Sequence, residues 1–144
     1  MPKVLISDKM SEKAYQTFTA RGIECDYNPG LELAELEKII GDYDGLAIRS
    51  STKVNQALLA KAKNLKIVGR AGIGVDNVDL EAATEAGVIV MNTPFGNSIT
   101  TAEHALAMLF SLARQIPQAN ASTHLCKLEK SRFMGIELTG KTLG

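Results

Sequence analysis

Short apolar runs recur about every twenty residues over residues 1–96, and this rhythm limits the folds that are open to the chain. The runs begin near Val4, Ile23, Gly45, Lys66 and Val88. Apolar residues between the runs follow a helical spacing, and glycines at positions 22, 41 and 87 close three of these stretches. Most runs are apolar at consecutive positions, as in parallel strands that helices cover on both faces. The pattern predicts an α/β fold with a doubly wound parallel sheet of five strand–helix units.

The pattern changes beyond residue 96. A turn-rich segment at 93–97 leads into a long stretch with helical apolar spacing, which runs from Thr100 to Ile116. Pro117 should kink or end this helix, since proline cannot donate the hydrogen bond that continues it. Residues 139–144 have the pattern of a turn and the first residues of a new strand. We therefore expect residues 97–144 to hold a long interdomain helix and the truncated start of a second domain.

Charge and composition disfavour several classes of protein. Sixteen basic residues balance sixteen acidic ones, so the chain has no overall attraction for nucleic acid or for membranes. The longest apolar block, Ala105–Ala113, is far shorter than the roughly 20 residues that span a bilayer. Cys25 and Cys126 have no metal-ligand spacing, and two isolated thiols are typical of reduced cysteines in the cytoplasm. The sequence predicts a cytoplasmic protein without a metal site.

Two arginines follow neighbouring apolar runs. Arg49 and Arg70 are 21 residues apart, which is one strand–helix unit, so both should lie over the same edge of the sheet. Ligands of open parallel sheets bind at that edge, and guanidinium groups match carboxylate and phosphate oxygens. The Gly72-Ile73-Gly74 turn would let main-chain N–H groups approach an anion closely. These residues predict a small anion-binding crevice. The alternative is that the arginines are solvated or pair with Asp8 and Asp76.

The same Gly72-Ile73-Gly74 turn looks like the start of a dinucleotide-binding loop, but two confirming features are missing. The third glycine of that fingerprint would stand where the chain has Asn77, and the acidic residue that holds a ribose would stand at Asn92. A small anionic ligand is therefore favoured over a dinucleotide pyrophosphate. His104 and His124 have no nearby nucleophile and no second ligand, and we interpret them as structural or solvated.

The chain also contains three longer motifs, RAGIGVDNVDLEAATEAGVIVMNTPFGNS, TTAEHALAMLFSLARQIPQA and FMGIELTGKTLG. They resemble the D-2-hydroxyacid dehydrogenase family, and the resemblance covers nearly the whole chain. It implies that residues 1–96 form a flavodoxin-like substrate-binding domain. It also implies that the long helix crosses into a Rossmann domain, which binds NAD and mediates dimerisation. The main NAD-binding glycine motif would then lie beyond Gly144.

The resemblance also implies roles for single residues. The residues that would bind the substrate are Arg49, Ser50, Arg70, Gly72, Ile73, Gly74 and Asn97. Ile73 and Thr101 would lie beside the nicotinamide of NAD. The family's catalytic histidine, its glutamate partner and the arginine that orients the substrate carboxylate lie outside this chain, so we expect no catalytic residue within it. Neither His104 nor His124 matches that histidine.

The activity that the resemblance implies is the NAD-dependent oxidation of 3-phospho-D-glycerate to 3-phosphohydroxypyruvate in serine biosynthesis, by a homo-oligomer that is a dimer or a tetramer. The chain alone should supply substrate contacts without turnover. One alternative is another hydroxyacid dehydrogenase, acting on glyoxylate or hydroxypyruvate. A second is a stand-alone ligand-binding or subunit-docking fragment. A signalling receiver is disfavoured, because Arg49 stands where a receiver needs an aspartate.

One segment departs from the family pattern. Similar sequences carry the motif THAGKW. This chain has the same first two residues, at 123 and 124, but continues with Leu125-Cys126-Lys127-Leu128. The loss of the glycine restricts a turn, and the loss of the tryptophan removes a large packing surface. We therefore expect an altered local loop around Cys126.

Overall fold

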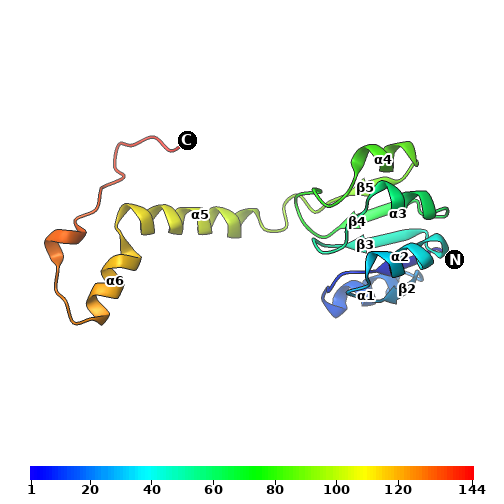
Figure 1. Cartoon of the computed structure of the whole chain (residues 1–144), viewed down its shortest axis with the longest axis horizontal. Coiled ribbons are helices and arrows are strands. Elements are labelled where there is room, and N and C mark those ends of the chain that lie inside the picture. The colour runs from blue at the N-terminus through cyan, green and yellow to red at the C-terminus, as the bar shows by residue number, and fades with distance from the viewer. The chain divides into compact units, whose positions relative to one another are not determined.

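Five parallel strands form the sheet of the amino-terminal unit in the computed structural model, which describes all 144 residues (Figure 1). The strands are β1 Lys3–Ile6, β2 Glu24–Tyr27, β3 Gly45–Ile48, β4 Ile67–Arg70 and β5 Ile89–Met91. Their order in the sheet is β2-β1-β3-β4-β5, and every neighbouring pair is parallel. Because this is the strand order of a flavodoxin-like doubly wound fold, the predicted fold class is confirmed.

Four α-helices connect the strands. They are α1 Glu12–Ala20, α2 Leu33–Ile39, α3 Gln56–Lys61 and α4 Leu80–Glu85, and a 3-10 turn, η1 Ile40–Asp42, follows α2. Two of them begin at side chains that cap the first turn. Asn55 Oδ1 accepts a hydrogen bond from the Leu58 N–H at 2.9 Å, and Asp79 Oδ1 accepts one from the Ala82 N–H at 3.0 Å. These bonds satisfy main-chain donors that a helix start leaves without a partner.

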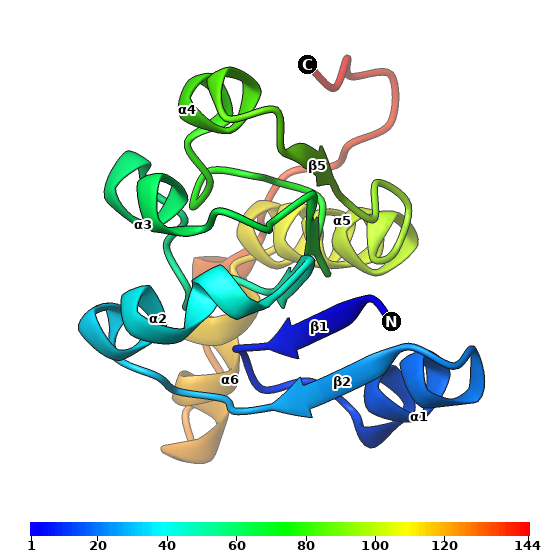
Figure 2. The same ribbon diagram turned by 90° about the vertical axis from the view of Figure 1, so that its right-hand side faces the viewer.

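The hydrophobic core lies on the face of the sheet that α2, α3 and α4 cover, while α1 lies on the other face (Figure 2). Its fully buried members include Leu5, Leu46, Ile48, Val68, Leu36 and Leu58. On β5, Val90 packs against this core, whereas the alternate residues Ile89 and Met91 are exposed. Alternate residues of β3, Leu46 and Ile48, belong to this core, and a shift of the strand by one residue would turn these side chains to the other face. On β1, Val4 and Ile6 are buried as well as Leu5, so both faces of this strand are covered. The carboxyl ends of β1, β3 and β4 carry the candidate site.

The chain divides into two compact units, Met1–Gly96 and Asn97–Gly144. The elements of the second unit are α5 Ser98–Ala113, α6 Ile116–His124 and a 3-10 helix, η2 Lys130–Phe133. The predicted long helix is present, but it ends before Pro117, which lies in the first turn of α6. The predicted strand within residues 139–144 is absent, and Lys141 N–H instead closes a turn there. The functional roles that the sequence suggested for the two parts of the chain stay predictions.

The α5 helix has a largely apolar surface. Its exposed apolar side chains are Ile99, Leu106, Met108, Phe110 and Leu112, each with about half or more of its surface accessible. None of the helices, α5 included, combines the length and the hydropathy that a membrane span needs. Apolar surface of this extent is typical of a helix that another segment or another subunit covers.

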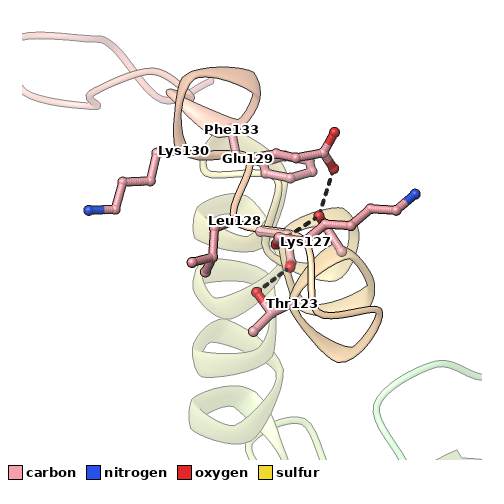
Figure 3. Close-up of a pocket in the computed structure, with 8 residues that line it drawn as sticks. Thr123, Lys127, Leu128, Glu129, Lys130 and Phe133 are labelled. Atoms are coloured by element: carbon pink, nitrogen blue, oxygen red, sulfur yellow. Dashed lines mark hydrogen bonds between the residues drawn. The ribbon is translucent and has the colours of Figure 1, made fainter.

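The turn after α6 contains a strained residue at the position where the family pattern has glycine. Cys126 has φ 57°, in the left-handed region that glycine adopts without steric cost. Leu128, which stands at the tryptophan position of the pattern, is 88% exposed in the turn that Figure 3 shows. The strain therefore lies where the sequence led us to expect a restricted turn.

Cys126→Gly should raise the free energy of unfolding by about 1 kcal/mol, because it removes the clash between Cβ and the main chain at positive φ. Urea unfolding followed by circular dichroism measures the change. Cys25→Gly is the matched control: Cys25 lies within β2, where glycine should lower stability by roughly 0.5–1 kcal/mol. A Cys126→Gly chain that is no more stable than the parent would contradict strain at this turn.

Candidate functional site

The candidate site lies at the carboxyl edge of the sheet, where β3 and β4 end side by side. Ile48 pairs with Arg70 in the parallel register of these strands, so Arg49 directly follows the paired position. Two chain segments meet there: the Arg49–Thr52 segment after β3 and the loop of residues 71–77 after β4. The structure thus brings together both arginines and the glycine turn that the sequence singled out.

The Asp8 carboxylate, just after β1, organises the Arg49–Thr52 segment. It is 3% exposed and accepts hydrogen bonds from the main-chain N–H groups of Arg49 at 2.6 Å, Ser51 at 3.2 Å and Thr52 at 3.1 Å. It also accepts the Thr52 hydroxyl at 2.7 Å. Burial opposes ionisation of Asp8, but the hydrogen bonds from Thr52 and Arg49 outweigh it and lower the pKa of this carboxyl. The sequence had suggested only an ion pair between Asp8 and an arginine, whereas the carboxylate instead binds main-chain donors.

The Arg49 side chain is exposed above this edge. Its guanidinium makes one long contact within the chain, from Nη1 to the Lys9 carbonyl at 3.4 Å. Ser50, the next residue, is also exposed. A guanidinium on a fixed main chain, with most of its five donors unpaired, is suited to bind a carboxylate or a phosphate.

The Arg70 side chain, by contrast, folds back over its own loop and is only 12% exposed. Its Nε donates to the Arg49 carbonyl at 3.3 Å, its Nη1 donates to the Gly74 carbonyl, and its Nη2 lies 3.6 Å from Asp76 Oδ1. The alternative of pairing with Asp76 therefore holds for Arg70, while Arg49 does not pair with Asp8 through its guanidinium. Arg70 stiffens the loop and neutralises its acidic residue.

The two glycines of the turn make room for this arrangement. A Cβ atom on Gly72 would lie 2.8 Å from Arg70 Nη1, and one on Gly74 would lie 2.9 Å from Asp76 Oδ1. The space that a pyrophosphate would need beside these glycines is thus filled by the chain's own side chains. The next helix, α4, begins only at Leu80, so no helix start follows the turn directly. The residues present therefore do not form a dinucleotide cradle.

The same turn does offer free main-chain donors. The N–H groups of Ile73 and Gly74 have no hydrogen-bond partner within the chain. Asn92 after β5 holds the turn from the other side, since its Nδ2 donates to the Ile73 carbonyl at 2.8 Å. Two adjacent N–H groups on a braced loop can bind a carboxylate.

Asn97 and Thr101 lie in the second unit, at the start of α5. Asn97 occupies the N-cap position without a capping bond from its side chain, and its carbonyl accepts the Thr101 N–H at 2.9 Å. Both residues are exposed. His104 and His124 are exposed on α5 and α6, and His124 Nδ1 lies 2.9 Å from the Asn120 carbonyl oxygen.

Comparisons with known proteins identify relatives of the whole chain. The family model for the catalytic domain of D-isomer specific 2-hydroxyacid dehydrogenases matches residues 4–139. The D-3-phosphoglycerate dehydrogenase of Archaeoglobus fulgidus is 47% identical over 142 residues, which are 99% of this chain and 27% of the relative. The human D-3-phosphoglycerate dehydrogenase is 49% identical over 142 residues, which again are 99% of this chain and 27% of the relative.

A solved structure has the same fold. The crystal structure of NAD+-bound 3-phosphoglycerate dehydrogenase from Entamoeba histolytica superposes with a TM-score of 0.68 at 28% sequence identity. The match covers 78% of this chain and 39% of that one. The chain thus spans about a quarter of the length of the curated relatives above, at 27% of each.

Proposed function

The chain belongs to the D-isomer specific 2-hydroxyacid dehydrogenase family, and we propose that it is the substrate-binding part of a D-3-phosphoglycerate dehydrogenase. The reaction of the whole enzyme is the NAD-dependent oxidation of 3-phospho-D-glycerate to 3-phosphohydroxypyruvate, in serine biosynthesis. The observation that carries the proposal is the 47–49% identity to proteins of that name over 99% of the chain. The exposed Arg49 guanidinium supports it, since the substrate is an anion.

The proposed substrate contacts fall into two groups. Arg49 and Ser50 bind one anionic end of the substrate, and the N–H groups of Ile73 and Gly74 bind its carboxylate. Gly72 contributes by leaving room for the Arg70 side chain. Arg70 adds positive charge near the substrate, but its bonds to its own loop make positioning its main role. In the second unit, the exposed Asn97, whose side chain makes no capping bond, is the proposed further contact.

NAD is the proposed cofactor of the whole enzyme, because the similar Entamoeba structure is described as NAD+-bound. When bound to the whole enzyme, NAD would supply the hydride acceptor for the oxidation of the hydroxy acid. In this chain, exposed Ile73 and Thr101 are the proposed contacts to its nicotinamide end. Since the residues present form no pyrophosphate cradle, we expect no turnover from the chain alone.

The proposed setting follows the same resemblance. Both cysteines are free thiols, as is usual in the cytoplasm, which is the compartment we propose. A homodimer or homotetramer is the proposed assembly of the whole enzyme, and the exposed apolar surface of α5 supports a subunit contact.

One observation favours a second candidate function. Because Arg70 is engaged within its loop, Arg49 is the only one of the two site arginines with a largely free guanidinium. A single free guanidinium suits a substrate with one anionic end, as for a dehydrogenase that acts on glyoxylate or hydroxypyruvate. The two functions differ in whether a phosphate contributes to binding.

Calorimetric titration of the chain with 3-phospho-D-glycerate and with D-glycerate separates these two functions. We expect 3-phospho-D-glycerate to bind at least about tenfold more tightly than D-glycerate, since hydrogen bonds to a charged group contribute about 1.5–3 kcal/mol. 2-Phospho-D-glycerate is the matched control, because it carries the same charge in another arrangement, and it should bind more weakly than the 3-phospho isomer. Equal affinities for 3-phospho-D-glycerate and D-glycerate would favour the second candidate function.

A further inference from the structure

We propose that Asn77 is a positioning residue for Arg49, whose side-chain amide holds the Arg49–Thr52 segment in the shape that presents the Arg49 guanidinium to an anionic substrate. The proposal rests on the proposed function, since that function makes Arg49 a substrate contact. Asn77 itself touches no substrate in this account. It acts through the main chain of the neighbouring segment.

The Asn77 side chain joins the two ends of that segment. Its Nδ2 donates to the Arg49 carbonyl at 2.8 Å and to the Thr52 carbonyl at 2.6 Å, so both amide protons are used. The Asn77 main-chain carbonyl accepts the Val54 N–H at 2.9 Å. Asn77 thus ties the loop after β4 to residues 49–54 at three points, two of which lie in the Arg49–Thr52 segment.

These bonds complete a set that fixes both peptide groups of Arg49. Its N–H donates to Asp8 Oδ2 at 2.6 Å. Its carbonyl accepts from Asn77 at 2.8 Å and from Arg70 Nε at 3.3 Å. With both neighbouring peptides held, the direction of the Arg49 Cα–Cβ bond is fixed, and the side chain remains the free part of the residue.

The orientation of the Asn77 amide leaves one of its own atoms without a hydrogen bond. Its Oδ1 is buried without a hydrogen-bond partner. The opposite orientation would place this oxygen against the Arg49 and Thr52 carbonyl oxygens, where it would be repelled. An unpaired buried acceptor calls for an explanation in a folded protein. The explanation here is that a side chain with two donors is needed at this position.

Asn77→Asp tests the proposal, because it keeps the shape of the side chain and replaces the two donated bonds with oxygen–oxygen repulsion. Asn64→Asp is the matched control: Asn64 Nδ2 donates to the Gly41 carbonyl at 2.7 Å, away from the site. In calorimetric titrations with 3-phospho-D-glycerate, Asn77→Asp should weaken binding about tenfold or more, the combined worth of two ordinary hydrogen bonds. Asn64→Asp should bind as the parent chain does. Equal affinity of the Asn77→Asp chain and the parent would overturn the proposal.

A second measurement needs no ligand. Amide hydrogen exchange followed by NMR should show slow exchange of the Arg49 and Thr52 N–H groups in the parent and in Asn64→Asp, and faster exchange in Asn77→Asp. Asn77→Ala, which removes the donors without adding charge, should give the same result if the aspartate variant does not fold. Unchanged exchange in the Asn77 variants would overturn the proposal.

The binding titration and the exchange measurement distinguish a failure of the positioning role from a failure of the proposed function. If the parent chain fails to bind 3-phospho-D-glycerate, the proposed function fails for this chain. The positioning role is then judged on exchange alone: faster exchange confined to the Arg49–Thr52 segment supports it, and unchanged or uniformly faster exchange rejects it.

Discussion

Asp8→Ala should lower the free energy of unfolding by about 3–5 kcal/mol, because it leaves four part-buried donors without their acceptor and each such loss costs about 1–3 kcal/mol. In the folded chain this one carboxylate accepts three main-chain N–H groups and the Thr52 hydroxyl. These donors lie 41 to 44 residues away in the sequence, so Asp8 also ties β1 to the segment after β3. The loss should be felt in global stability as well as in the order of the site.

Urea unfolding of the two chains measures this difference. Asp79→Ala is the matched control, since Asp79 accepts a single N–H at the start of α4 and its loss should cost about 1 kcal/mol. If Asp8→Ala destabilises the chain no more than Asp79→Ala does, the Asp8 carboxylate does not hold the segment as described.

The stability that Asp8 provides should also depend on pH. The folded chain lowers the pKa of this carboxyl below its ordinary value of 3.8, so folding favours the ionised form. The contribution is therefore fully present above pH 3.8 and is lost as the pH falls through the lower pKa of the folded state. The difference in unfolding free energy between the parent and Asp8→Ala should shrink below pH 3.8. A difference that grows on acidification would contradict the lowered pKa.

Arg49→Ala should weaken the binding of 3-phospho-D-glycerate by roughly 10- to 150-fold, since hydrogen bonds to a charged group contribute about 1.5–3 kcal/mol. The stability of the chain should change little, because the Arg49 guanidinium makes only one long contact, to the Lys9 carbonyl. The bonds that organise the segment use the main chain of Arg49, and alanine keeps them.

The control for this substitution is Arg21→Ala. Arg21 is an exposed arginine at the end of α1, so its loss changes the net charge equally without touching the site. Calorimetry at two salt concentrations then separates a local contact from general attraction, because salt screens only the latter strongly. If both variants lose the same affinity, the guanidinium of Arg49 does not contact the substrate.

The sheet could be predicted from the sequence because local patterns determine it. Strands buried on both faces have apolar runs, and the helices between them end at glycines with positive φ, such as Gly22 at 70° and Gly87 at 69°. The caps at Asn55 and Asp79 are local as well, since each side chain accepts the N–H of the third residue after it. Each of these features depends on residues within a few positions of one another.

The end of α5 could not be predicted in this way. Pro117 suggested a break at that residue, but the helix ends at Ala113, where the Ile136 N–H donates to the Ala113 carbonyl at 2.9 Å. Gln115 then takes a left-handed conformation before α6 begins. The contact from Ile136 comes from more than twenty residues away, and no local pattern reveals it.

The organisation of the site was missed for the same reason. Sequence spacing placed Arg49, Arg70 and the glycine turn at one edge of the sheet, and the structure shows them there. It could not show that Arg70 folds onto its own loop or that Asp8 and Asn77 hold the main chain of Arg49. Asn77 was noted only as a residue that fails a glycine pattern. The amide side chain of Asn77, in the loop after β4, is the sequence feature that could have indicated a contact with the neighbouring loop.

The central claim, that this chain carries the substrate site of a D-3-phosphoglycerate dehydrogenase, is tested most directly by NMR titration of the isotopically labelled chain with 3-phospho-D-glycerate. We expect saturable shifts centred on the N–H groups of Ile73 and Gly74 and on the Arg49 and Ser50 signals. At the opposite end of the sheet, for example at Asn64, the changes should be small. Shifts absent from both site segments, or centred elsewhere on the chain, would contradict this claim.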